Sequence, residues 1–374
     1  MQVENMERRV RHALRGLFGS EVADLSKLDN LGGHASLRIY WRVHLPSDIG
    51  RAYPRGESSL MAMVMPQSDA AMASEEGTSS SDPTPLELPF VNVQRYLADI
   101  GMPVPAIDHV DLEQGLLFLE DLGDEMFEHA VLDAADTPEI EGLYREAIEL
   151  LVRFQVNALA SRMNDTDSNR CVAWARAFDR ELLRWELDHY REWGLEARLG
   201  VEQIAPFRQR LDAQFDKIVA FLLDAPQTLV LRDYQSRNIM RKAGTWIMID
   251  FQDALRGPFI YDLVALLRDS YIALEPDSVE RLVAYYAACG QSAGLPWCTD
   301  EKLVHSTFHV QTLQRKLKDA GRFVFIDRVK HNPSFLPYYN PSIAYVENAL
   351  RHLPEFESLH ALLLEIEPAM QSTP

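Results

Sequence analysis

Apolar and polar residues alternate along residues 37–45, and this alternation predicts a strand. The odd-numbered residues from Leu37 to Leu45 are apolar, and the even-numbered residues from Arg38 to His44 carry a polar group. A period of two is typical of a half-buried strand, and the glycines at 32 and 33 predict a turn before it. Residues 59–65 are almost wholly apolar and predict a second strand.

Residues 66–89 differ sharply from these strands. They are rich in Ser, Asp, Glu and Pro, so they have too few apolar side chains to form a core. We expect a mobile insertion here. A helix over about 89–100 and a strand over 115–123 follow, separated by the Pro-Val-Pro break at 103–105.

From about residue 137 the apolar spacing becomes helical, most clearly over 140–160 and 178–199. Residues 226–250 return briefly to strand as a hairpin. Strands and helices therefore do not alternate throughout, as a doubly wound parallel sheet would require. The pattern predicts an α+β protein with a small β-rich N-lobe at 1–121 and a large, mainly helical C-lobe at 122–374.

Composition narrows the possible functions. A length of 374 residues suits two domains, and a net charge of −19 argues against nucleic-acid binding, which needs clustered Lys and Arg. The three cysteines are scattered and predict reduced thiols rather than a disulfide or zinc framework. No run is long enough to cross a bilayer, and the N-terminus predicts an amphipathic helix rather than a signal peptide. We expect a cytoplasmic protein that does not bind membranes.

Two apolar segments of the predicted hairpin end in aspartate, at Asp233 and Asp250, and Asn238 lies five residues after the first. Carboxylates beside buried strands are costly unless a cation or hydrogen bonds compensate them. Two carboxylates and an amide oxygen are ligands that suit Mg²⁺. Asp233 could instead open a turn and Asp250 could cap the next element, but a turn and a cap do not require Asn238.

These loops have a known counterpart. The segments LRDYQSRN (231–238) and IDFQD (249–253) resemble the catalytic and metal-binding loops of the aminoglycoside phosphotransferase superfamily, which has a protein-kinase-like fold. Within it, ASLRIYWR, IDFQDALRGPFIYD and QRKLKDAGRF (314–323) are similar to segments of the anomeric kinases of cell-wall sugars. The matching segments lie in order from residue 31 to residue 323 and so span most of the chain.

The resemblance assigns roles residue by residue. Asp233 matches the catalytic base, Asn238 and Asp250 match the Mg²⁺ ligands, and Asp262 matches an aspartate that supports the catalytic loop. The residues expected to bind ATP are those of the phosphate-covering loop, the strand after it and the adenine hinge: Gly32, Gly33, Ala35, Ser36, Arg38, Glu120 and Leu122. Arg232 and Arg237 flank the base, and each could contact phosphate, form a structural pair with a carboxylate or face solvent.

The chain departs from the superfamily pattern at two positions. Leu231 replaces a histidine that mainly packs within the loop, and Met63 occupies the place of the lysine that holds the nucleotide phosphates in protein kinases. Arg38 or Arg42, on the polar face of the first strand, could replace that lysine, or both could face water.

The substrate wall is expected on the acidic helix at 181–193. Glu186, His189 and Trp193 could hydrogen-bond to a sugar or stack on it, although their spacing equally fits an ordinary amphipathic face. We assign Asp253 to the same substrate group.

We therefore expect an ATP- and Mg²⁺-dependent kinase that phosphorylates a hydroxyl of a small molecule. The expected acceptor is the anomeric hydroxyl of an amino sugar, N-acetylmuramate or N-acetylglucosamine. The alternatives are a kinase for an aminoglycoside, choline or another small alcohol, and a pseudokinase that binds nucleotide without turnover. The sequence leaves the oligomeric state open.

Overall fold

A computed structural model describes residues 2–32, 38–47, 49, 57–65, 87–164 and 171–371. These residues form two compact units. The first contains the described residues up to 65, residues 87–125 and residues 240–252, and the second contains those of 126–239 and 253–371. The expected insertion lies outside the described residues as far as residue 86, and Pro89 already begins a helix.

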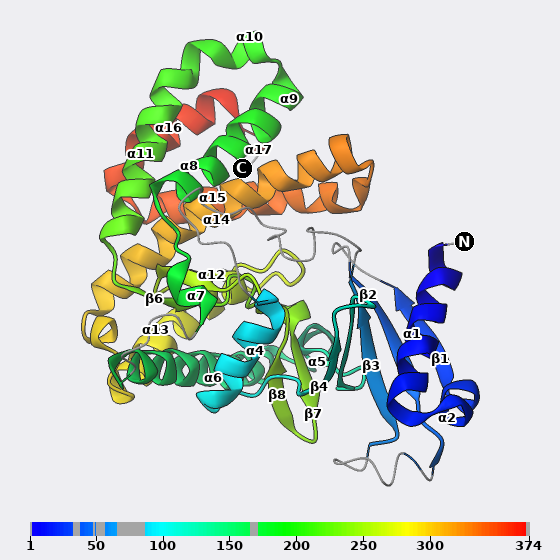
Figure 1. Ribbon diagram of the computed structural model, residues 1–374. Helices are drawn as coiled ribbons and strands as arrows, with labels where there is room; N and C mark the ends of the chain where they lie inside the picture. Colours follow the sequence, from blue (N-terminus) through cyan, green and yellow to red (C-terminus); the bar gives the residue numbers. More distant parts are fainter. Residues whose placement is uncertain are drawn as a thin grey trace. The chain divides into compact units, whose positions relative to one another are not determined.

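The first unit is built on an antiparallel sheet, with β1, β2 and β3 labelled near the N-terminus in Figure 1. Its five strands have the order β1-β2-β3-β5-β4. The alternation predicted for residues 37–45 is confirmed where the structure describes it, because Trp41, Val43 and Leu45 are buried. Two strands were not predicted, since their sequences KLDNLG and IDHVD are polar and they form the two edges of the sheet. The strands are β1 (Lys27–Gly32), β2 (Ile39–His44), β3 (Ser59–Val64), β4 (Ile107–Asp111) and β5 (Leu116–Glu120).

Helices complete the core of this unit. The predicted N-terminal amphipathic helix is α1 (Gln2–Phe18), and its Val10 and Leu14 are buried with Trp41 and Phe118 of the sheet. The helix predicted near 89–100 is α4 (Pro89–Asp99). The short helix α2 (Ser20–Leu25) also belongs to this unit.

The predicted hairpin between residues 226 and 250 is only partly correct. Strands β7 (Ile239–Lys242) and β8 (Thr245–Met248) do form a two-stranded sheet, as expected. However, β6 (Gln227–Val230) pairs antiparallel with β9 (Leu255–Pro258), which was not predicted because Gly257 and Pro258 are poor strand formers. The 3₁₀ turn η4 (Ser236–Asn238) separates β6 from the hairpin.

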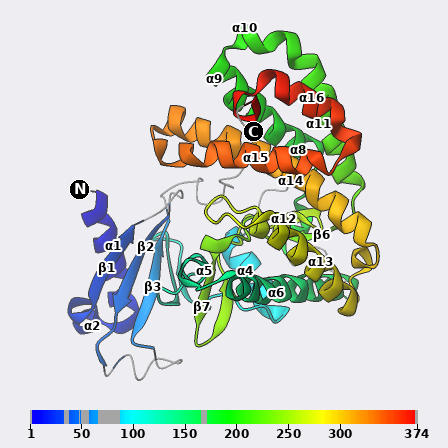
Figure 2. The same cartoon turned by 180° about the vertical axis from the view of Figure 1, so that it is seen from behind.

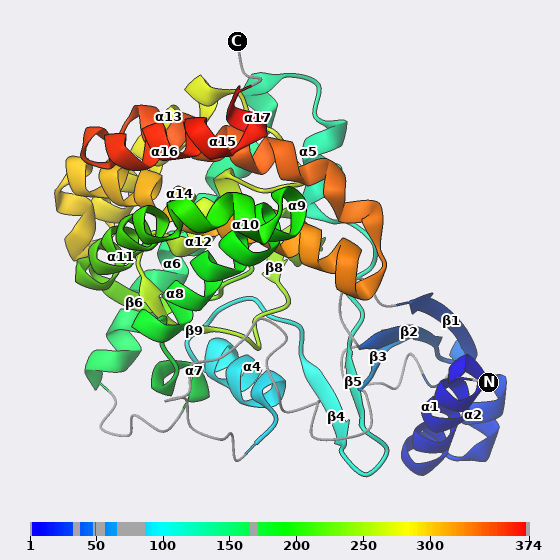
Figure 3. The same cartoon turned by 90° about the horizontal axis from the view of Figure 1, so that it is seen from above.

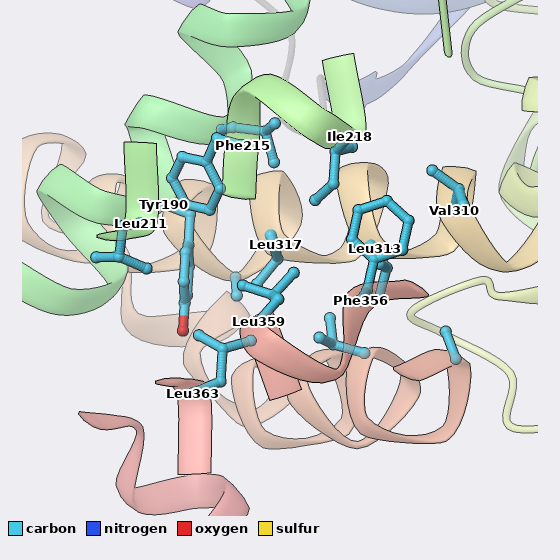
Figure 4. Packing of buried hydrophobic residues seen from close by; sticks show 14 of the residues in the cluster. Tyr190, Leu211, Phe215, Ile218, Val310, Leu313, Leu317, Phe356, Leu359 and Leu363 are labelled. Carbon is cyan, nitrogen blue, oxygen red and sulfur yellow. The ribbon is translucent and has the colours of Figure 1, made fainter. Parts of the chain in front are cut away.

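The second unit is mainly helical, and α14 and α15 lie side by side in it (Figure 2, Figure 3). One of its apolar clusters includes Tyr190, Phe215, Leu317 and Leu359, drawn from four separate segments of the chain (Figure 4). The longer helices are α6 (Thr137–Asn164), α8 (Arg180–His189), α11 (Arg208–Asp224), α13 (Pro276–Ser292), α14 (Glu301–Lys330), α15 (Tyr339–Arg351) and α16 (Glu357–Ile366).

Shorter segments join these helices. A π-helical turn, η2 (Tyr190–Glu196), continues directly from α8. Gly321 of α14 packs against it so closely that an added Cβ would lie 2.7 Å from the carbonyl oxygen of His189. The short segments are α5 (Phe127–Asp133), α7 (Val172–Ala175), α9 (Ala197–Leu199), α10 (Val201–Ile204), η3 (Ala205–Phe207), α12 (Tyr261–Leu267), η5 (Pro296–Thr299), η6 (Pro333–Tyr338), η7 (Pro354–Phe356) and α17 (Pro368–Gln371).

The small strand-rich part and the large helical part confirm the predicted α+β class. Among the described residues, none of the helices combines the length and the apolar character needed to cross a membrane. The lobe boundary at residues 121 and 122 remains a proposal.

Candidate active site

A buried carboxylate, that of Asp262, accepts hydrogen bonds from the backbone at the start of the loop after β6. The backbone N–H groups of Leu231 and Arg232 donate to the two oxygens of Asp262, at 2.7 and 3.0 Å. Burial raises the pKa of Asp262 to about 7, and this effect outweighs the two N–H donors and the nearby Arg315, which lower the pKa. Leu231 is itself buried, so it retains a packing role at the position where the superfamily pattern has histidine.

A second buried aspartate, Asp269, supports the far end of the loop. The backbone N–H of Ser236 donates to it at 2.8 Å, and the hydroxyl of Ser236 donates to the same oxygen. The sequence analysis missed Asp269. Asp269 lies two residues after α12 ends, where no periodic pattern marked it.

Arg232 does not present its side chain to a ligand. Its guanidinium is buried, donates to Glu186 of α8 at 2.9 Å and lies over the ring of Phe178. Glu186 is equally buried and also accepts from Gln314 of α14. Removing one member of such a buried ion pair leaves an uncompensated charge, which costs about 3–5 kcal/mol. Of the alternatives considered for Arg232, the structure therefore shows the ion pair with a carboxylate. Its partner is Glu186, which was expected to contact the substrate.

Asp233 combines a fixed backbone with a side chain that reaches solvent. Its carbonyl accepts from the N–H of Gln235 and from the side-chain amide of Asn238, both at 2.9 Å. Its carboxylate is 16% exposed and lies 3.5 Å from the guanidinium of Arg315. Arg315 also donates to the carbonyl of Arg232 at 2.8 Å, so it fixes the loop and the carboxylate together.

Arg315 is the second residue that the sequence analysis missed. It lies in the segment QRKLKDAGRF, which supported the resemblance although no residue of it received a role. Its guanidinium is buried and lies over the ring of Tyr261. The Arg315 side chain therefore helps to fix the position of Asp233.

Arg237 lies on the outer side of the loop. It forms an ion pair with Glu128 of α5 at 2.9 Å, and its guanidinium lies 3.6 Å from the centre of the Tyr271 ring. The side chain is 42% exposed, so a further contact with an anionic ligand remains a proposal.

Asp250 lies in the first unit, two residues after β8 ends. Its backbone is in the left-handed region, with φ of 60°, and its side chain is 42% exposed. Gln252 donates to its carboxylate at 2.8 Å, and the guanidinium of Arg38 lies 3.7 Å from it. The carboxylate of Asp250, which could bind a metal ion, and the guanidinium of Arg38 thus lie next to each other after β8.

The alternative cation, Arg42, has a different environment. It forms ion pairs with Asp121 and Asp124, both at 2.8 Å, beside the expected adenine hinge. The hydrogen bond to Asp124 and the charge of Asp121 raise the pKa of Arg42. Of the two arginines considered as replacements for the missing lysine, the structure therefore places only Arg38 next to the expected metal ligand.

The other expected nucleotide residues are in the first unit. Met63 is buried on β3 opposite Tyr40, so it does not present a polar group. The carboxylate of Glu120 accepts from Lys242 at 2.8 Å and from the N–H of Ala106, and Leu122 is buried. Gly32 ends β1 with φ of 77°, a backbone conformation that favours glycine. Gly33, Ala35 and Ser36 lie outside the described residues.

The expected substrate wall contains a row of aromatic rings. His189 is buried and stacks on Trp185, with ring centroids 5.5 Å apart, while Phe325 contacts both His189 and Trp193. Trp185, which the sequence analysis did not name, is 46% exposed and borders a surface hollow of about 670 Å³. Asp253 is 5% exposed and so offers little surface to a ligand.

The fold and the family comparisons define the class of the protein. A solved structure of a choline/ethanolamine kinase family protein from Mesorhizobium loti superposes with a TM-score of 0.56 and 14% identity, over 96% of this chain and 99% of that one. The predicted protein-kinase-like fold is thereby confirmed. The model of the phosphotransferase enzyme family matches residues 79–298, and the chain belongs to this family.

Curated relatives narrow the comparison. An N-acetylmuramate/N-acetylglucosamine kinase of Neisseria meningitidis is 32% identical over 278 residues, which cover 74% of this chain and 79% of the relative. A protein of the same name from Pseudomonas putida is 29% identical over 283 residues, which cover 75% of this chain and 78% of the relative. The chain is accordingly a small-molecule kinase, as the resemblance implied.

Proposed function

We propose that this protein transfers the γ-phosphoryl group of ATP to the anomeric hydroxyl of an amino sugar, N-acetylmuramate or N-acetylglucosamine. The observation that carries the proposal is the similarity to relatives named for these sugars, over about three quarters of both chains. The family match includes both the Asp233 loop and Asp250. The reaction would take place in the cytoplasm, where ATP is available.

Asp233 would act as the base of the reaction. Its loop is fixed by Asp262, Asp269 and Arg315, so the carboxylate does not have to be ordered when the sugar binds. It would orient the attacking hydroxyl and accept its proton as the phosphoryl group is transferred. The anomeric hydroxyl is more acidic than an ordinary alcohol, which makes this proton transfer easier.

Asn238 and Asp250 suit the Mg²⁺ that accompanies ATP in this family. An amide binds a metal ion through its oxygen, and the nitrogen of Asn238 donates to the carbonyl of Asp233, while Asp250 contributes a half-exposed carboxylate. When bound, the ion neutralises charge on the phosphates. Arg38, beside Asp250, would supply the positive charge that lysine gives in protein kinases.

The nucleotide would contact the first unit. We assign its phosphates to the loop that begins at Gly32 and to Arg38, and its adenine to the backbone near Glu120 and Leu122. The carboxylate of Glu120 is already bound by Lys242, so a contact with adenine would use backbone groups rather than this side chain.

The test is turnover with defined acceptors, ATP and Mg²⁺. Incubation with N-acetylglucosamine or N-acetylmuramate should yield a sugar 1-phosphate, with loss of the reducing end in step with ADP release. Phosphorus NMR should place the ester on the anomeric carbon. A 6-phosphate product, or turnover only with an aminoglycoside or choline, would contradict the acceptor, while ATP binding without any turnover would favour a pseudokinase.

A further inference from the structure

The helices α13 and α14 bring together two histidines and a glutamate, none of which has a role in the site described above. His305 and His309 lie four residues apart on α14, and Glu280 faces them from α13. One potential ligand atom of each side chain lies within 4.8 Å of the other two. Within the part of the chain that the structure describes, no other set of three His, Cys, Asp or Glu residues converges in this way.

The distances are close to those of a metal centre. Nδ1 of His305 lies 3.4 Å from Oε2 of Glu280, and Nε2 of His309 lies 4.0 Å from Oε1. A tetrahedral zinc ion with bonds of about 2.0–2.2 Å holds such ligand atoms about 3.3 Å apart. The His305–Glu280 pair therefore already has the required spacing. The His309–Glu280 distance, measured to the other carboxylate oxygen, must shorten by less than an ångström, and all three ligand atoms lie within 4.8 Å of one another, so a bound ion would draw them closer together.

A simple ion pair accounts for only part of this cluster. His305 and Glu280 are close enough to hydrogen-bond, but Nε2 of His309 is too far from Glu280 for a hydrogen bond. The His309 side chain is only 5% exposed, and its Nδ1 has no hydrogen-bond partner among the described residues. The nitrogen that faces Glu280 is Nε2, so Nε2 is the atom of His309 that would bind an ion.

One of the two rings is packed in place, and the other has a second carboxylate nearby. Nε2 of His305 lies 3.9 Å from Glu301, a distance beyond a direct hydrogen bond, so Glu301 acts on this ring through its charge. The ring of His309 stacks on that of His352, with centroids 4.4 Å apart and planes only 3° from parallel. His352 is in turn fixed through Nδ1, which lies 2.9 Å from the carbonyl oxygen of Asn348.

We propose that Glu280, His305 and His309 form a binding site for a zinc-like divalent cation, with water completing the coordination. Two imidazoles and one carboxylate suit zinc and its neighbours in the periodic table, whereas the oxygen ligands proposed for the nucleotide site suit Mg²⁺. Glu280 and His305 are partly exposed, so an ion can enter from solvent. The bound ion cross-links α13 to α14, the helix that carries Arg315, and thereby stabilises the second unit.

The experiment titrates zinc chloride into the chelator-treated, full-length protein in excess Mg²⁺ and without ATP. We expect one zinc ion per chain and an unfolding temperature that rises with zinc concentration. Cobalt(II) should give the strong visible absorption of a tetrahedral complex with nitrogen and oxygen ligands. Absence of saturable binding, or a complex with sulfur ligands, would overturn the proposal.

Variants locate the ion. His305→Gln and Glu280→Gln alter partly exposed side chains, so both variant proteins should remain folded. Each substitution should weaken zinc binding by more than about a hundredfold. Residues that only hydrogen-bond to a metal ligand already contribute about ten- to a hundredfold to metal affinity, and a direct ligand should contribute more. Glu301→Gln should weaken binding by only about tenfold. His129→Ala, which removes an exposed histidine of α5, serves as the matched control and should bind zinc like the wild type. Equal binding by His305→Gln and the wild type would place the metal elsewhere and reject the site.

Discussion

Two strand ends in this protein have the same backbone conformation but different surroundings. After β6, Arg232 is left-handed with φ of 76°, and after β8, Asp250 is left-handed with φ of 60°. Side chains other than glycine rarely adopt this conformation, so both positions carry backbone strain. In both cases the left-handed residue lies at or directly before a carboxylate that follows a buried strand, Asp233 at the first end and Asp250 at the second.

The contacts that hold the two ends differ. At the first, Asp262 binds two backbone N–H groups, Glu186 pairs with Arg232, and Arg315 binds the carbonyl, all in buried surroundings. At the second, the carboxylate is 42% exposed and is approached by Gln252 and Arg38. A base must be positioned before its substrate arrives, whereas a metal ligand must stay accessible to an ion that arrives with the nucleotide. We therefore expect changes at the first end to affect turnover and stability, and changes at the second to affect binding.

The largest effect is expected for Asp233→Asn. It should lower kcat by roughly two to four decades, the usual contribution of a positioned general base. ATP affinity, measured by calorimetry, should be unchanged, because Asp233 is proposed to contact the acceptor sugar and not the nucleotide. Asp224→Asn, an exposed aspartate at the end of α11, is the control and should retain full activity. An equal loss of ATP affinity in Asp233→Asn would show that this carboxylate serves the nucleotide instead.

At the second end, Asp250→Asn should weaken Mg²⁺-dependent nucleotide binding by about ten- to a hundredfold. The reason is that an interaction made by a charged side chain contributes about 1.5–3 kcal/mol to the free energy of binding. Asparagine tolerates the left-handed backbone, so the unfolding free energy should change little. The measurement is calorimetry with and without a chelator. Wild-type binding that is equally tight in the chelator would argue for a metal-free nucleotide site.

Asp262→Asn tests the buried anchor of the first end. The amide offers one acceptor oxygen for two backbone N–H donors, so unfolding in urea should require about 1–3 kcal/mol less free energy. The pKa of Asp262 in the folded chain, about 7, lies above its ordinary value of 3.8. The folded protein therefore retains a proton that the unfolded chain releases between about pH 4 and 7.

The pH dependence of this anchor follows from that difference. The stabilising contribution of Asp262 is full below about pH 4 and declines as the pH rises toward 7. The difference in unfolding free energy between wild type and Asp262→Asn should consequently shrink from pH 5 to pH 8. A difference that grows with pH would mean that the carboxylate is ionised in the folded chain.

The smallest effect is expected for Arg315→Lys. Lysine keeps the positive charge but cannot bind the carbonyl of Arg232 and approach Asp233 at the same time. We expect kcat to fall by about tenfold through displacement of the base, with the KM for ATP unchanged. Arg328→Lys, an exposed arginine on the same helix, should behave as wild type. A loss confined to the KM for ATP would instead assign Arg315 to nucleotide binding.

Much of the architecture could be predicted from the sequence alone, because local patterns of apolar and polar residues specify the individual strands and helices. The alternation along residues 37–45, the helical spacing after 137 and the β7–β8 hairpin depend on neighbours in the chain, and each was found as predicted where the structure describes it. The polar edge strands β1 and β4 were missed because their side chains lack a periodic apolar face. The spacing of Asp233, Asn238 and Asp250 likewise identified the candidate site, and their roles remain predictions.

Only the tertiary structure decided which partner each polar residue has. Arg232 and Glu186 are 46 residues apart in the sequence and become a buried pair because α8 packs against the loop. Arg38 and Arg42 are alike in the sequence, yet one lies beside Asp250 and the other is bound by Asp121 and Asp124. Burial and ion pairing depend on segments that meet only after folding, so a local pattern can identify a charged residue but cannot determine its partner.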